Sequence, residues 1–122
     1  TGVQTCALPI LKASANITAY SDERLKKNWR DLPQNFVEKL ANVKNGIYER
    51  IDREITQVGV SAQSLQKLLP EAIDEAEDEM KTLSVSYGNA ALASAVELAK
   101  EIVMLKDLVK QLSNKIEMLE NR

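Results

Sequence analysis

The sequence predicts an α+β fold, in which a small domain of short strands and helices is followed by one long C-terminal helix that forms a parallel coiled coil. Short apolar runs bounded by turn residues fill the middle of the chain, as expected for short elements. A heptad pattern of apolar residues fills its C-terminal part. With 122 residues, of which 44% are hydrophobic, the chain is long enough for one small domain and too short for two.

The N-terminal part contains a strand signal followed by helix signals. Residues 16–20, Asn-Ile-Thr-Ala-Tyr, are β-prone and predict a short strand. Ser21, followed by two acidic residues, predicts the start of a helix that Pro33 interrupts. Apolar residues at helical spacing predict a second helix over 34–44, ended by Asn45 and Gly46 because glycine readily adopts a left-handed C-terminal cap.

The central part predicts a hairpin, a short helix and a further strand. Strands are expected over 47–51 and 55–60, joined by a turn. A helix is expected over 62–69, since Pro70 stops it. The acidic residues 74–79 lack the glycine and the ligand spacing of a calcium loop and predict a solvated loop. A third strand is expected over 83–87.

The last predicted element is one long helix over 89–120. Its apolar residues are spaced alternately by four and three positions, which is the heptad seam of a coiled coil, and Ala91 and Ala95 extend the seam towards the N-terminus. A helix packed on its own domain is the alternative, but the preceding domain is too small to cover a helix of this length. The seam consists of Leu98, Ile102, Leu105, Val109, Leu112, Ile116 and Leu119.

The charges beside the seam favour parallel helices in register. With Ile102 at position a, Glu101 and Lys106 form a complementary g–e pair, and so do Lys115 and Glu120. Ile and Val at position a with Leu at position d favour a dimer, whereas Leu108 at a g position widens the apolar stripe and favours more helices. The residues alone leave dimer and trimer open.

Composition argues against several classes of function. A net charge of −2 gives no electrostatic reason to expect nucleic acid or a membrane as a partner. The sequence contains no histidine, so a histidine-based triad or metal site is excluded. Because the sequence shows no phosphate loop and no metal cluster either, we expect no cofactor and no metal. We also do not expect an enzyme that acts on a small molecule.

The first ten residues have an unusual origin. They read Thr-Gly-Val-Gln-Thr-Cys-Ala-Leu-Pro-Ile, which is the translation of a sequencing adapter at every position. We therefore expect residues 1–10 to be foreign to the protein and exclude them from the prediction of the fold. We also expect the natural protein to continue upstream of Leu11.

Four short motifs follow one another along the chain. Residues 21–28 read Ser-Asp-Glu-Arg-Leu-Lys-Lys-Asn, and the other three motifs are residues 58–63, 69–72 and 83–88. In this order they resemble the four motifs of the intramolecular chaperone domains of phage endosialidases and related tail fibres, whose opening signature is Ser-Asp-x-Arg-Leu-Lys-x-Asn. Ser61 departs from the apolar residue that is usual in the second motif, which affects packing and not chemistry. Besides Ser21 and Lys26, the motif residues are Asp22, Arg24, Leu25, Asn28, Gly59, Gln63, Pro70 and Tyr87.

The resemblance implies a function. Domains of this family trimerise, hold three chains in register while the upstream β-fibre folds, and then release themselves by autoproteolysis. It implies that residues 21–122 are this chaperone and auto-peptidase domain and that residues 11–20 end a truncated fibre region. The partners would be two further copies and the fibre region of the same chain. Assembly would take place in the bacterial host cytoplasm, with the parent protein in the virion tail. Trp29 replaces a smaller apolar residue, and we expect it to pack in the core or at the trimer interface.

The resemblance also implies a serine–lysine dyad of Ser21 and Lys26, with cleavage between Tyr20 and Ser21. A serine needs a base, and a lysine serves as one only when neutral, a form that desolvation or a nearby cation such as Arg24 or Lys27 favours. On a continuous helix, positions i and i+5 face apart. Ser21 must therefore lie outside the helix, or Lys26 must come from a neighbouring chain. Without the resemblance, a helix cap and a surface lysine would be the simpler interpretations.

Two alternatives share this fold. A structural trimerisation domain of a fibre or adhesin would keep the coiled coil without cleavage, although the intact Ser21 and Lys26 argue against it. A membrane-linked transcription factor of the myelin regulatory factor type would need a transmembrane helix after the coiled coil, and we do not expect one.

Overall fold

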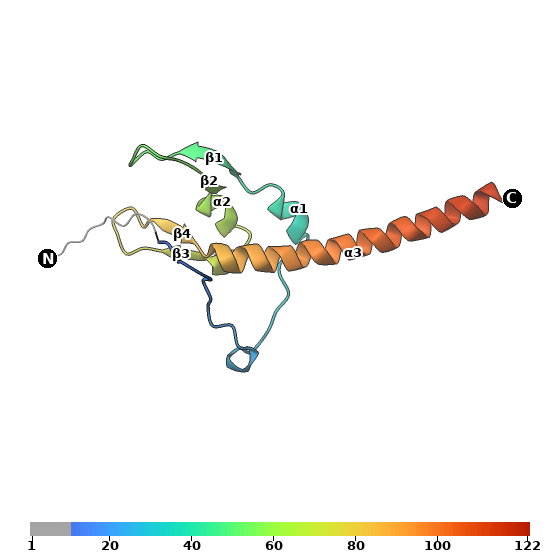
Figure 1. Ribbon diagram of the computed structural model, residues 1–122, viewed down its shortest axis with the longest axis horizontal. Helices are drawn as coiled ribbons and strands as arrows, with labels where there is room; N and C mark the ends of the chain where they lie inside the picture. The colour runs from blue at the N-terminus through green and yellow to red at the C-terminus, as the bar shows by residue number, and fades with distance from the viewer. Residues whose placement is uncertain (1–10) are drawn as a thin grey trace. The chain divides into compact units, whose positions relative to one another are not determined.

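The computed structural model describes residues 11–122, which fall into two units divided between Asp31 and Leu32 (Figure 1). Residues 1–10, which are predicted to be adapter-derived, lie outside the described residues. The first unit, as far as it is described, covers residues 11–31. The second unit is Leu32–Arg122 and contains most of the secondary structure.

The first unit is extended apart from one tight turn, the 3₁₀ helix η1 (Glu23–Leu25). Residues 16–20, expected to be the last strand of the upstream region, form no strand in this chain: a strand needs a hydrogen-bonded neighbour, and both pairs of strands among the described residues form elsewhere. The helix predicted to start at Ser21 is wrong, since the helical segment is a single turn capped by Asp22. It ends where Lys26 becomes extended, with φ −123° and ψ 145°.

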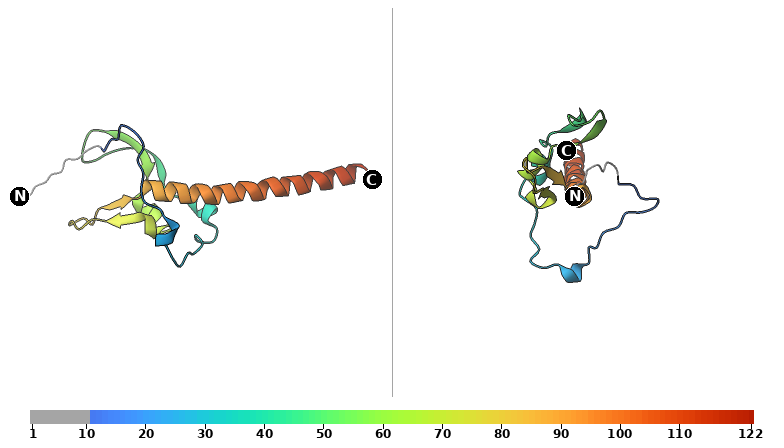
Figure 2. Two further views of the ribbon diagram at one scale, coloured as in Figure 1. Left: turned by 60° about the horizontal axis from the view of Figure 1, so that its bottom comes forward. Right: turned by 90° about the vertical axis from the view of Figure 1, so that its left-hand side faces the viewer.

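The second unit contains two small antiparallel sheets, several short helices and one long helix (Figures 1 and 2). This mixture confirms the predicted α+β class with a long C-terminal helix. In chain order the elements are α1 (Phe36–Leu40), β1 (Asn45–Glu49), β2 (Thr56–Val60), α2 (Ala62–Gln66), η2 (Pro70–Ala72), β3 (Ile73–Glu75), β4 (Leu83–Val85) and α3 (Tyr87–Glu120).

Helix α1 is shorter than the predicted helix over 34–44, and Asn45 and Gly46 begin β1 instead of ending a helix. The reason is tertiary. The backbone of Lys44 accepts a hydrogen bond from the Ser61 N–H at 2.9 Å and donates one to Ser64 Oγ at 3.0 Å. These bonds draw the chain out of the helix and into pairing with β2.

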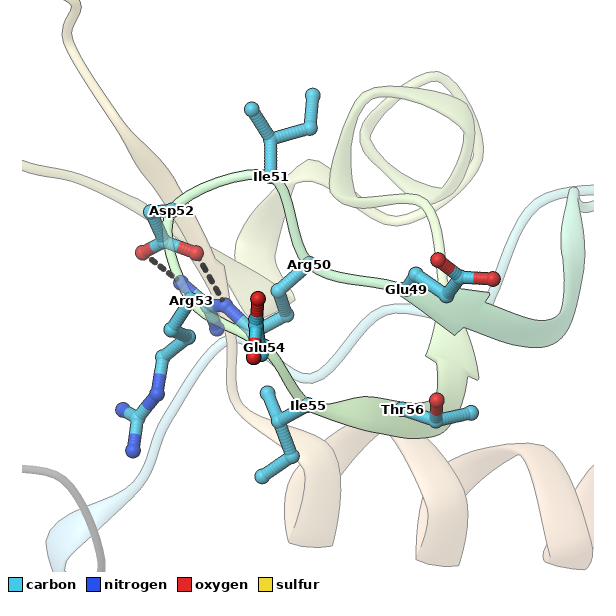
Figure 3. A pocket seen from close by; sticks show the side chains of 8 residues that line it. All are labelled: Glu49, Arg50, Ile51, Asp52, Arg53, Glu54, Ile55 and Thr56. Atoms are coloured by element: carbon cyan, nitrogen blue, oxygen red, sulfur yellow. Dashed lines mark hydrogen bonds and ion pairs between the residues drawn. The ribbon is translucent and has the colours of Figure 1, made fainter.

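Strands β1 and β2 form the predicted hairpin, with Ile47 opposite Val58. Both strands stop short of their predicted ends at the loop, where the Arg50 side chain turns onto Asp52. Arg50 Nε and Nη2 donate to the two carboxylate oxygens of Asp52 at 2.7 and 2.6 Å (Figure 3). Ile51 lies on the outside of this loop and is fully exposed (Figure 3).

Helix α2 is capped by Ser61, whose Oγ accepts the Ser64 N–H at 3.1 Å. The unusual serine of the second motif thus has a capping role in this chain. The acidic segment predicted as a loop is partly wrong, since its first residues belong to β3 and pair with β4. Asp78 then closes the connection by accepting hydrogen bonds from the Thr82 backbone and hydroxyl.

The core of the second unit is small. Its buried apolar residues are Phe36, Val43, Leu65, Leu68, Ala72 and Ala90. Helix α3 contacts α1 and η2, and only Ala90 and Ser94 among its residues are buried.

Beyond Glu101, every residue of α3 is exposed within the single chain. This part covers about 28 Å at ~1.5 Å per residue. Figure 1 shows the helix running on past the other elements of its unit. The seam residues, from Leu98 to Leu119, are 41% to 63% exposed. Packing on its own chain therefore does not account for the heptad pattern.

Candidate functional site

Ser21 and Lys26 lie together in the first unit. Lys26 Nζ donates a hydrogen bond to Ser21 Oγ at 2.5 Å within the same chain. The five-residue spacing permits this because only one tight turn separates the two residues. Ser21 precedes the Asp22 cap, and Lys26 is already extended. The two side chains are therefore not held on opposite faces of one continuous helix.

The turn between them is fixed by local hydrogen bonds. The Leu25 N–H donates to the Asp22 carbonyl, and the Lys26 N–H donates to the Glu23 carbonyl, both at 3.0 Å. Asn28, three positions after the turn, has φ 56°, a left-handed conformation that asparagine tolerates better than most residues. The left-handed backbone at this position therefore explains why an asparagine suits it.

A charged pair stands beside the dyad. Arg24 Nε and Nη2 donate to the Asp22 carboxylate, with the shortest distance 2.8 Å, and the Arg24 backbone N–H also donates to it at 2.9 Å. The side-chain hydrogen bond from Arg24 is the main cause that lowers the pKa of Asp22. The Arg24 backbone N–H and the charge of Lys26 act in the same direction, against desolvation.

Trp29 contacts the dyad. The Lys26 ammonium lies 5.7 Å from the centroid of the Trp29 ring, within the range of a cation–π interaction. Trp29 is 69% exposed, so the expectation that it packs in the core is wrong for the single chain. Its packing at a trimer interface stays a prediction.

The dyad is open to solvent. Ser21, Lys26 and their neighbours from residue 11 to residue 31 are all exposed. Water therefore has access to both side chains in the single chain. The desolvation expected of an active base would have to come from another segment or another chain.

Two of the later motifs meet at Gly59. A Cβ at this position would lie 2.9 Å from Tyr87 Oη and 3.5 Å from the Tyr48 ring. Gly59 on β2 thus leaves room for Tyr87, the first residue of α3. Sequence reasoning identified both residues and missed their contact, because nothing in the spacing of the motifs indicates it.

We expect Gly59→Ala to destabilise the protein by about 1 kcal/mol, since Tyr87 must move to admit the methyl group. The matched control is Gly88→Ala in α3, where an added Cβ meets nothing within 4 Å. Alanine there should be neutral or stabilising, because it suits a helix better than glycine. Urea unfolding at equal protein concentration measures both. Equal destabilisation by the two changes would contradict the contact at Gly59.

The other motif residues have less distinctive places. Leu25 is 84% exposed on the turn, and Gln63 is exposed on α2. Pro70 occupies the first turn of η2, where its missing N–H costs nothing.

An open apolar groove of about 370 Å³ lies in the second unit, and sequence reasoning did not foresee it. Residues of α1, the hairpin, α2, β4 and the first turns of α3 line it. Tyr87, Ala90, Ala91 and Ser94 form its α3 side. Ala91 also belongs to the predicted seam, so the groove adjoins the start of the heptad pattern.

Among residues 11–122, no group of three or more His, Cys, Asp or Glu residues is placed to hold a metal ion. No helix of the same range is both long and apolar enough to cross a membrane.

Comparison with known families identifies the segment that contains the dyad. Residues 21–74 match the family described as "Chaperone of endosialidase", Peptidase_S74. The match begins at Ser21 and includes Lys26, Gly59, Gln63 and Pro70. The resemblance predicted from the motifs is thereby confirmed over residues 21–74, which are similar in sequence to this chaperone family.

The similar proteins are phage tail fibres. The chain is 38% identical over 96 residues to "Long tail fiber protein Gp37" of Enterobacteria phage M1, an alignment that covers 70% of this chain and 38% of the relative. It is 35% identical over 112 residues to the protein of the same name from Enterobacteria phage K3, covering 88% of this chain and 8% of the relative. The chain thus spans well under half the length of these relatives.

Proposed function

We propose that this chain is the intramolecular chaperone of a phage tail fibre, which trimerises, registers the fibre during folding and then releases itself by serine autoproteolysis at Ser21. The observation that supports this most directly is the contact of Lys26 Nζ with Ser21 Oγ at the start of the family match. On this proposal residues 21–122 are the chaperone and residues 11–20 end the fibre. Residues 1–10 are foreign.

Trimerisation is supported by the exposed seam of α3. Each α3 helix leaves a continuous apolar stripe uncovered beyond Glu101, and two further copies would cover it. The pairs Glu101–Lys106 and Lys115–Glu120 suit parallel helices in register. The number three comes from the family resemblance, with Leu108, 49% exposed beside the seam, in agreement with it.

A coiled coil at this place solves a folding problem. A trimeric β-fibre has mostly non-local contacts between chains, so ordering it costs entropy before any contact forms. A coiled coil forms from local contacts and raises the effective concentration of the other two chains to about the millimolar range. Assembly in the host cytoplasm and removal of the chaperone would then leave a kinetically trapped fibre in the virion tail.

The cleavage step is an acyl transfer from nitrogen to oxygen. Ser21 Oγ attacks the carbonyl carbon of Tyr20 through a five-membered ring, while neutral Lys26 takes the hydroxyl proton. The C–N bond between Tyr20 and Ser21 then breaks, the proton goes to the departing amine, and an ester joins Tyr20 to Ser21 Oγ. Water hydrolyses the ester to a Tyr20 carboxylate and a Ser21 that has both a free hydroxyl and a free amino group.

The turn supplies candidate groups for the developing oxyanion. Hydrogen bonds within the turn use the amides of Arg24, Leu25 and Lys26. The preceding amides, those of Asp22 and Glu23, are the donors that we assign to the oxyanion. Since the dyad is exposed in the single chain, we further propose that trimer assembly supplies its desolvation. Cleavage would then follow assembly.

The test is the mass of the expressed chain. Autoproteolysis should convert it into two fragments, residues 1–20 and 21–122, once per chain and without any added cofactor. After trimers have formed, the rate should not depend on chain concentration. Persistence of the intact chain in assembled trimers would contradict the cleavage and favour the alternative, a structural trimerisation domain that stays on the fibre. The solvent exposure of Ser21 and Lys26 favours that alternative.

A further inference from the structure

The carboxylate of Asp22 is a competitor for the lysine of the dyad. It belongs to the residue next to Ser21, and the charge of Lys26 already acts on it. A carboxylate and an ammonium that come close to each other tend to form an ion pair. Such a pair would draw Lys26 from Ser21 Oγ and favour the charged lysine, which cannot accept the hydroxyl proton.

Arg24 donates hydrogen bonds to that carboxylate from both its side chain and its backbone. Its Nε donates to Oδ1 at 3.1 Å and to Oδ2 at 3.2 Å, its Nη2 donates to Oδ2 at 2.8 Å, and its backbone N–H donates to Oδ1 at 2.9 Å. Both carboxylate oxygens thus have donors, and the guanidinium offsets their charge. Lys26 Nζ bonds to Ser21 Oγ in the same structure.

Building on the proposed cleavage, we infer that Arg24 is a positioning residue: its bidentate hold on Asp22 keeps that carboxylate from pairing with Lys26 and so leaves the lysine at Ser21. The role differs from that of a nearby cation acting on Lys26 directly. The proposed role predicts that replacing Arg24 changes the cleavage rate only while residue 22 bears a charge.

Arg24→Gln should slow self-cleavage of the full chain by about fivefold, the size of effect that an exposed ion pair can have. Asp22→Asn in the same chain should restore the rate to within about twofold of the unchanged chain, since asparagine keeps a capping oxygen and removes the competing charge. Asp22→Asn alone should cleave at least as fast as the unchanged chain. The readout is the intact mass over time, with assembly checked by sedimentation.

The matched control is Arg50→Gln in the hairpin loop. Arg50 holds Asp52 with the same fork and the same sequence separation, so the change removes an equivalent ion pair from the second unit. It should leave the cleavage rate unchanged.

Two outcomes would overturn the inference. A double variant, Arg24→Gln with Asp22→Asn, that is as slow as Arg24→Gln would mean that Arg24 only holds the turn in shape. An Arg24→Gln chain that cleaves at the normal rate would mean that the carboxylate does not compete. Two different results would contradict the proposed function itself. They are the absence of cleavage in the unchanged chain and cleavage that persists in Ser21→Ala.

Discussion

Ser21→Ala should abolish self-cleavage, a loss of about 10³-fold or more, because the substitution removes the nucleophile and leaves the rest of the turn unchanged. Lys26→Ala should have a comparable effect by removing the side chain that donates a hydrogen bond to Ser21 Oγ. Both variants should still assemble as full-length trimers, since neither residue contributes to the core or to the seam. Intact-mass measurement over time distinguishes the uncleaved chain from the two fragments.

The neighbouring Lys27 is the matched control for the lysine. It is also exposed, lies next to Lys26 and changes the net charge by the same amount when replaced. Lys27→Ala should retain most of the cleavage if contact with Ser21 is what matters. Cleavage that persists in Ser21→Ala would remove the mechanism. A fragment beginning at Asp22 would move the broken bond by one residue.

Leu105→Asp should abolish trimer assembly. In the proposed coiled coil, residue 105 is at a d position on the central axis, so assembly would bury three unpaired carboxylates together. A buried unpaired charge costs about 3 kcal/mol or more per chain, which exceeds what a short seam can offset. Leu112→Asp should act in the same way one heptad further on. Sedimentation at micromolar concentration should find monomers, and self-cleavage should fall with them if assembly desolvates the dyad.

Met104 is the control for the seam. It adjoins Leu105, is 66% exposed and lies off the heptad seam at an outer position of the helix. Met104→Asp introduces the same charge into the same turn of α3 and should leave the trimer intact. A stable monomer for the unchanged chain, or equal loss of assembly in both variants, would contradict the proposed seam.

The patterns that depend on neighbouring residues were predictable. The heptad seam, the hairpin of β1 and β2 and the long α3 follow from periodicity and turn residues, which reflect local geometry. The family follows from the order of its motifs, because each motif is short and contiguous. The choice of Ser21 and Lys26 came from the same resemblance and not from spacing, which on a helix would have separated them.

Tertiary structure decided the features that depend on distant partners. The strand expected over 16–20 does not form among the described residues because no strand pairs with it, whereas Asn45 and Gly46 enter a strand because Ser61 and Ser64 bind the backbone of Lys44. The contact of Gly59 with Tyr87 joins two motifs that the sequence keeps apart.

The sequence by itself determined the fold class, the resemblance of residues 21–74 to a chaperone family and the apolar seam, because all three depend on local patterns of residue type. Only the folded chain decided that a single 3₁₀ turn, and not a helix, separates Ser21 from Lys26, and that Arg24 takes up the carboxylate between them. The physical reason is that the length of a turn and the partner of a side chain depend on which groups compete for the same hydrogen bonds. That competition is settled in three dimensions.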